Sequence, residues 1–152
     1  MLAMYIDADG CPVKDEIYRV AKRYQLRVVV VSNRAIFVPE APLVERVRVA
    51  AGPDAADDWI AEHIEKDDVC VTADIPLAAR CVERGAQVLS TRGEIFTKDS
   101  IGQALAMRDL YSDLRDMGEM TGGPPPMSPR DRSRFAQRLD EVIQRVRRAA
   151  KK

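Results

Sequence analysis

The sequence has little histidine and no paired cysteines. Among its 152 residues there is one histidine, His63, and three cysteines, Cys11, Cys70 and Cys81, which form no C-x-x-C pair. An odd, scattered set of cysteines is typical of a reducing compartment and gives no disulfide framework. Serine–histidine–aspartate catalysis, histidine-rich zinc sites and histidine phosphotransfer would all depend on His63 alone. We therefore expect any chemistry to be carried by carboxylates.

The sequence also lacks a long apolar run and a net charge. No apolar stretch approaches the roughly 20 residues that cross a bilayer, and the first residues have no basic segment or cleavage site for export. We therefore expect a soluble, cytoplasmic protein without membrane contact. The 24 basic and 24 acidic side chains sum to zero, but residues 1–129 carry −6 and residues 130–152 carry +6. This excludes a globally basic protein and leaves a local basic segment.

Alternating strand and helix patterns predict an α/β fold. Buried or half-buried strands are expected at about 3–8, 27–32, 43–50, 68–73 and 86–90, and amphipathic helices at about 12–25, 55–66, 76–84 and 98–117, with a last one that begins after Ser128. This order predicts a three-layer α/β/α sandwich with a mainly parallel sheet of about five strands.

The chain divides into three expected regions. Residues 1–117 form the α/β domain, 118–129 form a linker rich in glycine and proline, and 130–152 form a basic helix. We expect that helix to pack on the same domain through Phe135, Leu139 and Ile143. An arm that binds the backbone of a nucleic acid is the alternative for this helix.

Aspartates gather where the predicted strands end. Three segments contribute: Asp7 and Asp9 after the first strand, Asp54, Asp57 and Asp58 at the start of the helix at 55–66, and Asp74 after the strand at 68–73. Ligands of open parallel sheets bind beyond the carboxyl ends of the strands, so we expect these acids at one edge. A bound cation would offset the electrostatic repulsion between these carboxylates. Oxygen ligands without histidine or cysteine suit Mg²⁺ or Mn²⁺. Two such ions can promote phosphodiester hydrolysis.

Each acid also has a purely structural explanation. Asp54 and Asp57 suit helix capping, and Asp58 suits a solvated surface. For Asp7 and Asp9, a strand that ends in D-x-D favours a functional role.

Further candidates follow the strands. Arg92 and Gly93 come after the strand at 86–90, where a guanidinium suits either a phosphate or a local ion pair. Asn33 suits contact with a sugar or phosphate, or a turn. The segment Thr121, Gly122 and Gly123 offers backbone N–H groups to a phosphate, or a hinge.

These residues lie in segments that resemble the YaiI/YqxD family of bacterial proteins, small uncharacterised domains related to the PIN-like nuclease fold. The similar segments are Ile6-Asp7-Ala8-Asp9 with Cys11-Pro12, Val31-Ser32-Asn33, Arg48 to Asp57, Val71 to Ala78, Arg92-Gly93-Glu94, Met107-Arg108-Asp109 and Thr121 to Pro124. Together they cover residues 3 to about 140, which is almost the whole chain.

The resemblance implies a PIN-like sandwich whose acids bind one or two Mg²⁺ or Mn²⁺ ions and cut single-stranded RNA. By position, the implied metal ligands are Asp7 and Asp9, Asp57 or Asp54, and Asp74, of which Asp7, Asp9, Asp57 and Asp74 are the candidate catalytic residues. Thr72 and Arg108 join Asn33, Arg92, Gly93, Thr121, Gly122 and Gly123 as candidates for substrate binding. Many PIN domains have a glutamate where this chain has Asp54, Asp57 and Asp58. PIN-like domains often dimerise, so a homodimer is among the expected assemblies.

A metal-dependent ribonuclease is the function expected, and two alternatives stay open. Asp7-Ala8-Asp9-Gly10 is similar to the start of a haloacid-dehalogenase-like phosphatase, with Asp7 as nucleophile and Asp9 as acid. Against this, Asp57 and Asp58 come too early for that family's late acids, and Lys98 is the only lysine between Lys66 and Lys151. The other alternative is a non-catalytic module that binds nucleic acid or protein.

Overall fold

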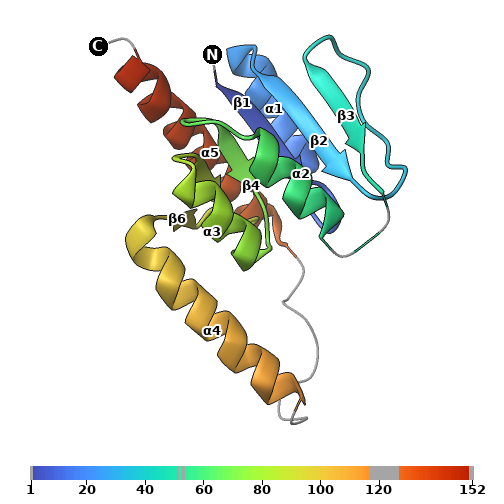
Figure 1. Ribbon diagram of the computed structural model, residues 1–152. Helices are drawn as coiled ribbons and strands as arrows, with labels where there is room; N and C mark the ends of the chain where they lie inside the picture. Colours follow the sequence, from blue (N-terminus) through green and yellow to red (C-terminus); the bar gives the residue numbers. More distant parts are fainter. Residues whose placement is uncertain (1, 51, 53, 117–126, 151–152) are drawn as a thin grey trace.

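The computed structural model describes residues 2–50, 52, 54–116 and 127–150, with only the backbone described for 109–116. In chain order the elements are β1 (Ala3–Asp7), α1 (Lys14–Tyr24), β2 (Arg27–Ser32), β3 (Val44–Arg48), α2 (Ala55–His63), β4 (Val69–Val71), α3 (Ile75–Glu83), β5 (Gln87–Leu89), β6 (Ile95–Phe96), α4 (Lys98–Asp116) and α5 (Pro129–Ala150) (Figure 1). Residues 118–126 of the expected linker, including Thr121, Gly122 and Gly123, lie outside the described residues.

One sheet organises the chain. Its strand order is β3-β2-β1-β4-β5-β6, and every neighbouring pair is parallel except β5 with β6. The predicted α/β class and mainly parallel sheet are confirmed. The sheet has six strands where about five were predicted, because β6 is only two residues long and leaves no alternation in the sequence.

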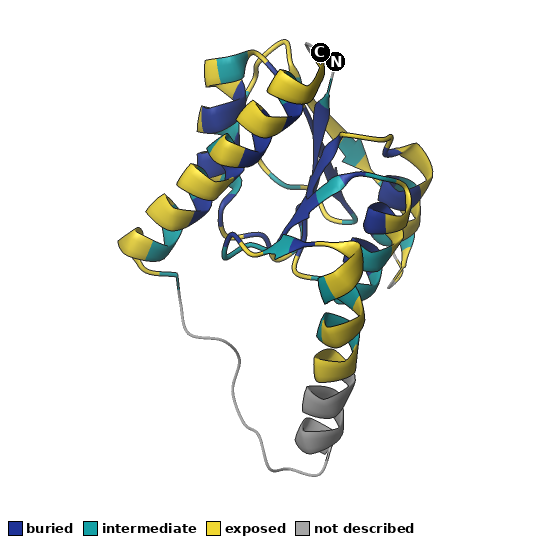
Figure 2. Ribbon diagram, turned by 90° about the vertical axis from the view of Figure 1, so that its left-hand side faces the viewer, coloured by how far each residue is buried: buried dark blue, intermediate teal, exposed yellow. Residues whose placement is uncertain are grey.

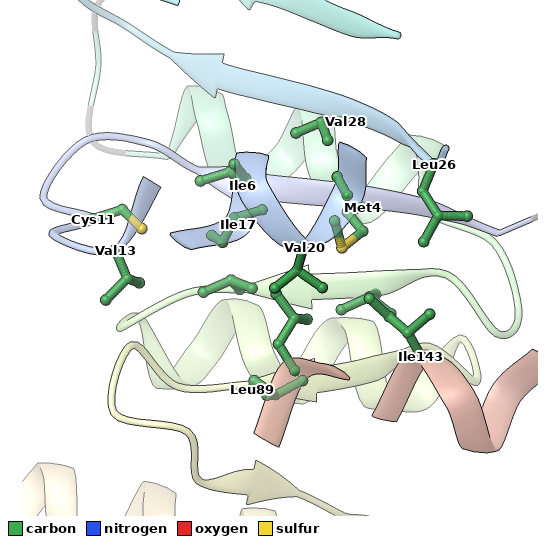
Figure 3. Close-up of a cluster of buried hydrophobic side chains, with 14 of the residues drawn as sticks. Met4, Ile6, Cys11, Val13, Ile17, Val20, Leu26, Val28, Leu89 and Ile143 are labelled. Carbon is green, nitrogen blue, oxygen red and sulfur yellow. The ribbon is translucent and has the colours of Figure 1, made fainter. Parts of the chain in front are cut away.

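Helices cover both faces of this sheet, which gives the three layers of a PIN-like sandwich. Successive residues of β2 alternate between the faces: Val28 and Val30 belong to a cluster with α1 and α5, and Val29 and Val31 to a cluster with α2 and α3. Figure 3 shows part of the first cluster, in which Ile17 and Val20 of α1 meet Met4 and Ile6 of β1. Because both faces are buried, the central strands are mainly apolar between their ends.

The helix α5 closes the first face. It begins with a capping box in which Ser128 Oγ accepts the Asp131 N–H at 3.1 Å and an Asp131 carboxylate oxygen accepts the Ser128 N–H at 3.0 Å. Phe135, Leu139 and Ile143 are fully buried in the first cluster, while the opposite side of the helix is exposed (Figure 2). Most basic residues of this helix lie on its exposed side, whereas Arg132 donates to Pro12 O and Arg147 lies over the ring of Tyr24.

The turn between β5 and β6 meets α5 closely at Gly93. This residue has φ +88°, which favours glycine, and a Cβ there would lie 3.4 Å from Phe135 Cα. The sequence marked Gly93 as a candidate for substrate binding. The structure shows that it is buried and that its backbone packs against α5.

The packing of α5 can be tested at Phe135. We expect Phe135→Ala to lower the free energy of unfolding by about 3–5 kcal/mol, because it removes a fully buried ring and leaves a cavity. Urea denaturation followed by circular dichroism measures this change. Ser133→Ala, on the exposed side of the same helix, is the control and should change stability by less than about 0.5 kcal/mol. Equal, small effects of both substitutions would contradict this packing.

Candidate functional site

Three of the predicted acids meet at the carboxyl edge of the sheet. Asp7 ends β1, Asp74 follows β4, and Asp57 lies in the first turn of α2, the helix that leads into β4. Strands β1 and β4 are parallel neighbours, paired from Met4 with Val69 to Ile6 with Val71, so their carboxyl ends lie together. Asp57 interacts electrostatically with both Asp7 and Asp74, and its carboxyl is within hydrogen-bonding reach of the Asp74 carboxyl.

A threonine holds two of these acids in place. The fully buried Thr72 donates its hydroxyl to Asp7 Oδ2 at 2.9 Å and accepts the Asp74 N–H on the same oxygen at 2.9 Å. Thr72 therefore links the end of β1 to the loop after β4. These two bonds position the acids, and the substrate contact that the family resemblance implies for Thr72 stays a prediction.

Asp74 also has a structural role, because it caps α3. Its Oδ1 accepts the Leu77 N–H at 3.0 Å, and Pro76 follows in the first turn. Capping uses one of the two carboxylate oxygens. The cap fixes the orientation of this acid relative to Asp57 and Asp7.

Burial and mutual repulsion disfavour the ionised forms of Asp7 and Asp57. Burial is the main cause that raises the pKa of Asp7, with Asp74 and Asp9 adding repulsion and the Thr72 hydroxyl opposing them. The pKa of Asp57 is raised to about 7, first by burial and then by the charges of Asp74 and Asp7 and by hydrogen bonding to Asp74. Asp57 is thus the acid whose charge the fold tolerates least.

Asp9 turns away from this trio towards the loop after β2. Its Oδ2 accepts the Asn33 N–H at 2.9 Å, and its Oδ1 lies 3.7 Å from Arg34 Nε. Asn33 therefore has a local partner through its backbone. Asp9 still contributes to the electrostatic repulsion at Asp7.

The two other aspartates at the start of α2 are peripheral. Asp54 occupies the N-cap position and is exposed, and its side chain makes no capping hydrogen bond among the described residues, contrary to the capping that the sequence suggested. It does add to the repulsion that raises the pKa of Asp57. Asp58 is exposed and pairs with Arg80 at 2.7 Å, as expected for a surface residue.

Two predicted arginines line a groove beside the acids. Arg92, whose Nη1 lies 3.6 Å from an Asp131 carboxylate oxygen, and the exposed Arg108 of α4 both border a groove of about 650 Å³. One end of the groove lies next to Asp74, because Ala73 and Ile75, which flank that acid, also line it. Sequence reasoning missed its other walls, which include Phe96, Gln103 and Met107, since β6 is too short to show a pattern and α4 gave only a helical period.

The donor set suits a hard divalent cation, but it is not a closed cage. Among the residues that the structure describes, no three of histidine, cysteine, aspartate and glutamate are grouped closely enough to hold one metal ion. The carboxylates interact electrostatically in pairs, Asp57 with Asp74, Asp57 with Asp7, and Asp7 with Asp74. Mg²⁺ is usually bound by one or two carboxylates, with water and substrate phosphate completing its shell, so such pairs fit it.

Comparison with known proteins identifies the family. Residues 5–145 match the family described as "Uncharacterized BCR, YaiI/YqxD family". The chain belongs to the YaiI/YqxD family. A UPF0178 protein of Nitrobacter winogradskyi is 57% identical over 148 residues, which cover 97% of this chain and 94% of that protein. A UPF0178 protein of Rhodospirillum rubrum is 56% identical over 148 residues, with 97% and 99% covered.

The match to the YaiI/YqxD family includes every described acid of the site. The family membership predicted from the sequence is therefore confirmed. Within the described parts of the chain, no helix is long and apolar enough to span a membrane.

The electrostatic cost of Asp57 can be measured through stability. A pKa raised on folding makes the ionised form destabilising, so the contribution of Asp57 to stability is most favourable below about pH 4 and is lost as pH rises towards 7. We expect Asp57→Asn to raise the Tm by about 2–4 °C at pH 8, or about 1 kcal/mol after allowance for solvent exposure, and to change it little at pH 4. Differential scanning calorimetry in EDTA at both pH values measures this. The exposed Asp58→Asn is the control, and an equal gain in that variant would contradict the assignment.

The positioning role of Thr72 can be tested by removing its hydroxyl. We expect Thr72→Val to destabilise the protein by about 1–3 kcal/mol, because it leaves Asp7 and the Asp74 N–H without their buried partner. Thr72→Ser keeps both bonds and should cost less. Urea titration of the two variants compares them, and a valine variant at least as stable as the serine variant would show that the bonds contribute nothing.

Proposed function

We propose that this protein is a Mg²⁺- or Mn²⁺-dependent nuclease that hydrolyses phosphodiester bonds in single-stranded RNA. The observation that carries this proposal is the convergence of Asp7, Asp57 and Asp74, from three distant segments, at the carboxyl edge of a PIN-like sheet. That edge is where open parallel sheets bind their ligands.

The acids have distinct tasks in this proposal. Asp74 would hold a cation together with Asp57 or Asp7, and Thr72 keeps Asp7 Oδ2 oriented through its 2.9 Å hydrogen bond. When bound, a divalent cation supplies the charge that activates water and stabilises the leaving oxygen in phosphodiester hydrolysis. An open shell of two carboxylates leaves room for water and a substrate phosphate.

The raised pKa of Asp57 links this chemistry to pH. Because Asp57 keeps its proton up to about pH 7, a cation that binds there must displace that proton. Cation affinity should therefore increase as pH rises from about 6 to 8.

We also propose that the protein acts in the cytoplasm. Cys11, Cys70 and Cys81 are all free and buried. Free thiols in a structure without disulfides are typical of a reducing compartment, which supports this location.

Cleavage assays with matched variants test the nuclease. The protein with Mn²⁺ or Mg²⁺ is incubated with single-stranded RNA and, separately, with p-nitrophenyl phosphate. We expect RNA cleavage that EDTA abolishes and that Asp7→Asn and Asp74→Asn each reduce by about 100-fold or more, because each removes a charge needed in the reaction. Asparagine is also a good N-cap residue, so Asp74→Asn should keep α3 intact.

The control and the contrary outcomes are defined by the same variants. Asp58→Asn removes an exposed acid of α2 that pairs with Arg80, so it should cleave like the parent protein. RNA cleavage that survives both active-site substitutions would indicate a contaminating enzyme and refute the proposal. Hydrolysis of p-nitrophenyl phosphate alone, lost in Asp7→Asn, would favour the phosphatase, and no hydrolysis of either substrate would favour a binding module.

A further inference from the structure

The groove next to Asp74 has a composition that suits a nucleotide. It runs from Ala73 and Ile75 at the acid site, past the turn between β5 and β6, to the side of α4. Its volume of about 650 Å³ lies within the range of small-ligand sites. The groove is therefore both large enough and close enough to hold the part of a substrate adjacent to the site of cleavage.

Apolar side chains form much of the groove wall. Ile75, Ile95, Phe96, Ala104 and Met107 line it, and 39% of Met107 remains exposed. An apolar wall of this kind suits the flat face of a nucleobase, because an unstacked base can be held between apolar and aromatic side chains.

Polar groups border the same groove. Arg92 and Arg108 carry guanidinium groups that suit phosphate, and Gln103 carries an amide that can donate to and accept from a base edge. Glu94 also lines the groove, and its backbone N–H donates a hydrogen bond to Ser90 Oγ at 3.0 Å. The arrangement combines an apolar surface for a base with positive charge for its backbone.

We propose that this groove binds an unpaired nucleotide of the RNA strand and thereby makes the protein selective for single strands. This inference rests on the proposed nuclease function, since it places the bound nucleotide beside Asp74. A base in a duplex is stacked and paired, so its face cannot reach Ile75, Ala104 and Met107. Arg108 and Arg92 would contact the phosphates that flank the bound base.

A binding titration without metal tests the groove separately from catalysis. Fluorescence anisotropy in EDTA follows a short fluorescein-labelled single-stranded RNA and an RNA hairpin duplex of the same length. We expect the single strand to bind more tightly than the duplex. Ala104→Leu fills the groove without a change of charge, keeps a good helix former, and should weaken single-strand binding by about tenfold.

Matched controls separate the groove from general effects. Ala106→Leu makes the same change on α4 at an exposed position that is not among the described residues lining the groove, and it should bind like the parent protein. Arg108→Ala should weaken binding by about threefold to tenfold and reduce the salt dependence by about 0.7 in the log–log slope. Arg19 lies on the exposed side of α1, on the other face of the sheet. Arg19→Ala should therefore change neither the RNA affinity nor its salt dependence.

The outcomes distinguish the two proposals. Three results would each overturn the proposal that the groove binds an unpaired nucleotide. They are equal RNA binding by Ala104→Leu and Ala106→Leu, equal affinity for duplex and single strand, and no RNA binding in EDTA. If Asp7→Asn abolishes metal-dependent RNA cleavage and Ala104→Leu leaves it unchanged, the nuclease proposal is supported and the groove proposal is refuted. If Ala104→Leu weakens RNA binding but no RNA is cleaved under any condition, the groove proposal is supported and the nuclease proposal is refuted.

Discussion

The parallel pairing of β1 with β4 is the constraint on which the site depends. These strands lie in the middle of the sheet, with both faces covered, and their register is set from Met4 with Val69 to Ile6 with Val71. A shift by one residue would move the apolar side chains of β1 to the wrong faces, so the register is strongly specified. Once it is set, Asp7 and Thr72 meet at the edge, and the 2.9 Å bond between them follows.

The acids at this edge repel one another. Burial and mutual repulsion raise the pKa of Asp7 and bring that of Asp57 to about 7, which is the reverse of the shift that a stabilising ion pair produces. Thr72 and the cap on α3 offset part of this cost through hydrogen bonds. Perturbed carboxyls gathered at a ligand-binding edge are typical of functional sites, which is why the proposed chemistry is assigned to them.

Local patterns were sufficient to predict most of the fold. The strand at 27–32 and the helix that begins after Ser128 both occur as expected, because a valine run and a capping box encode them within a few residues. The two-residue β6 left no such pattern, and the groove that it borders depends on how α4 lies against the sheet. Sequence spacing also could not show that Asp7 and Asp9 have different partners. Asp9 accepts the backbone N–H of Asn33, which belongs to a segment distant in the sequence.

The sequence by itself determined the class of the fold, the family and the acids available for chemistry, because periodicity and motif residues are local properties of the chain. The tertiary structure decided which acids act together. Asp57 joins Asp7 and Asp74, while Asp54 stays at the exposed start of α2 and Asp58 pairs with Arg80. Neighbouring positions on a helix point in different directions, so only the packing of α2 on the sheet could select one carboxylate of the three.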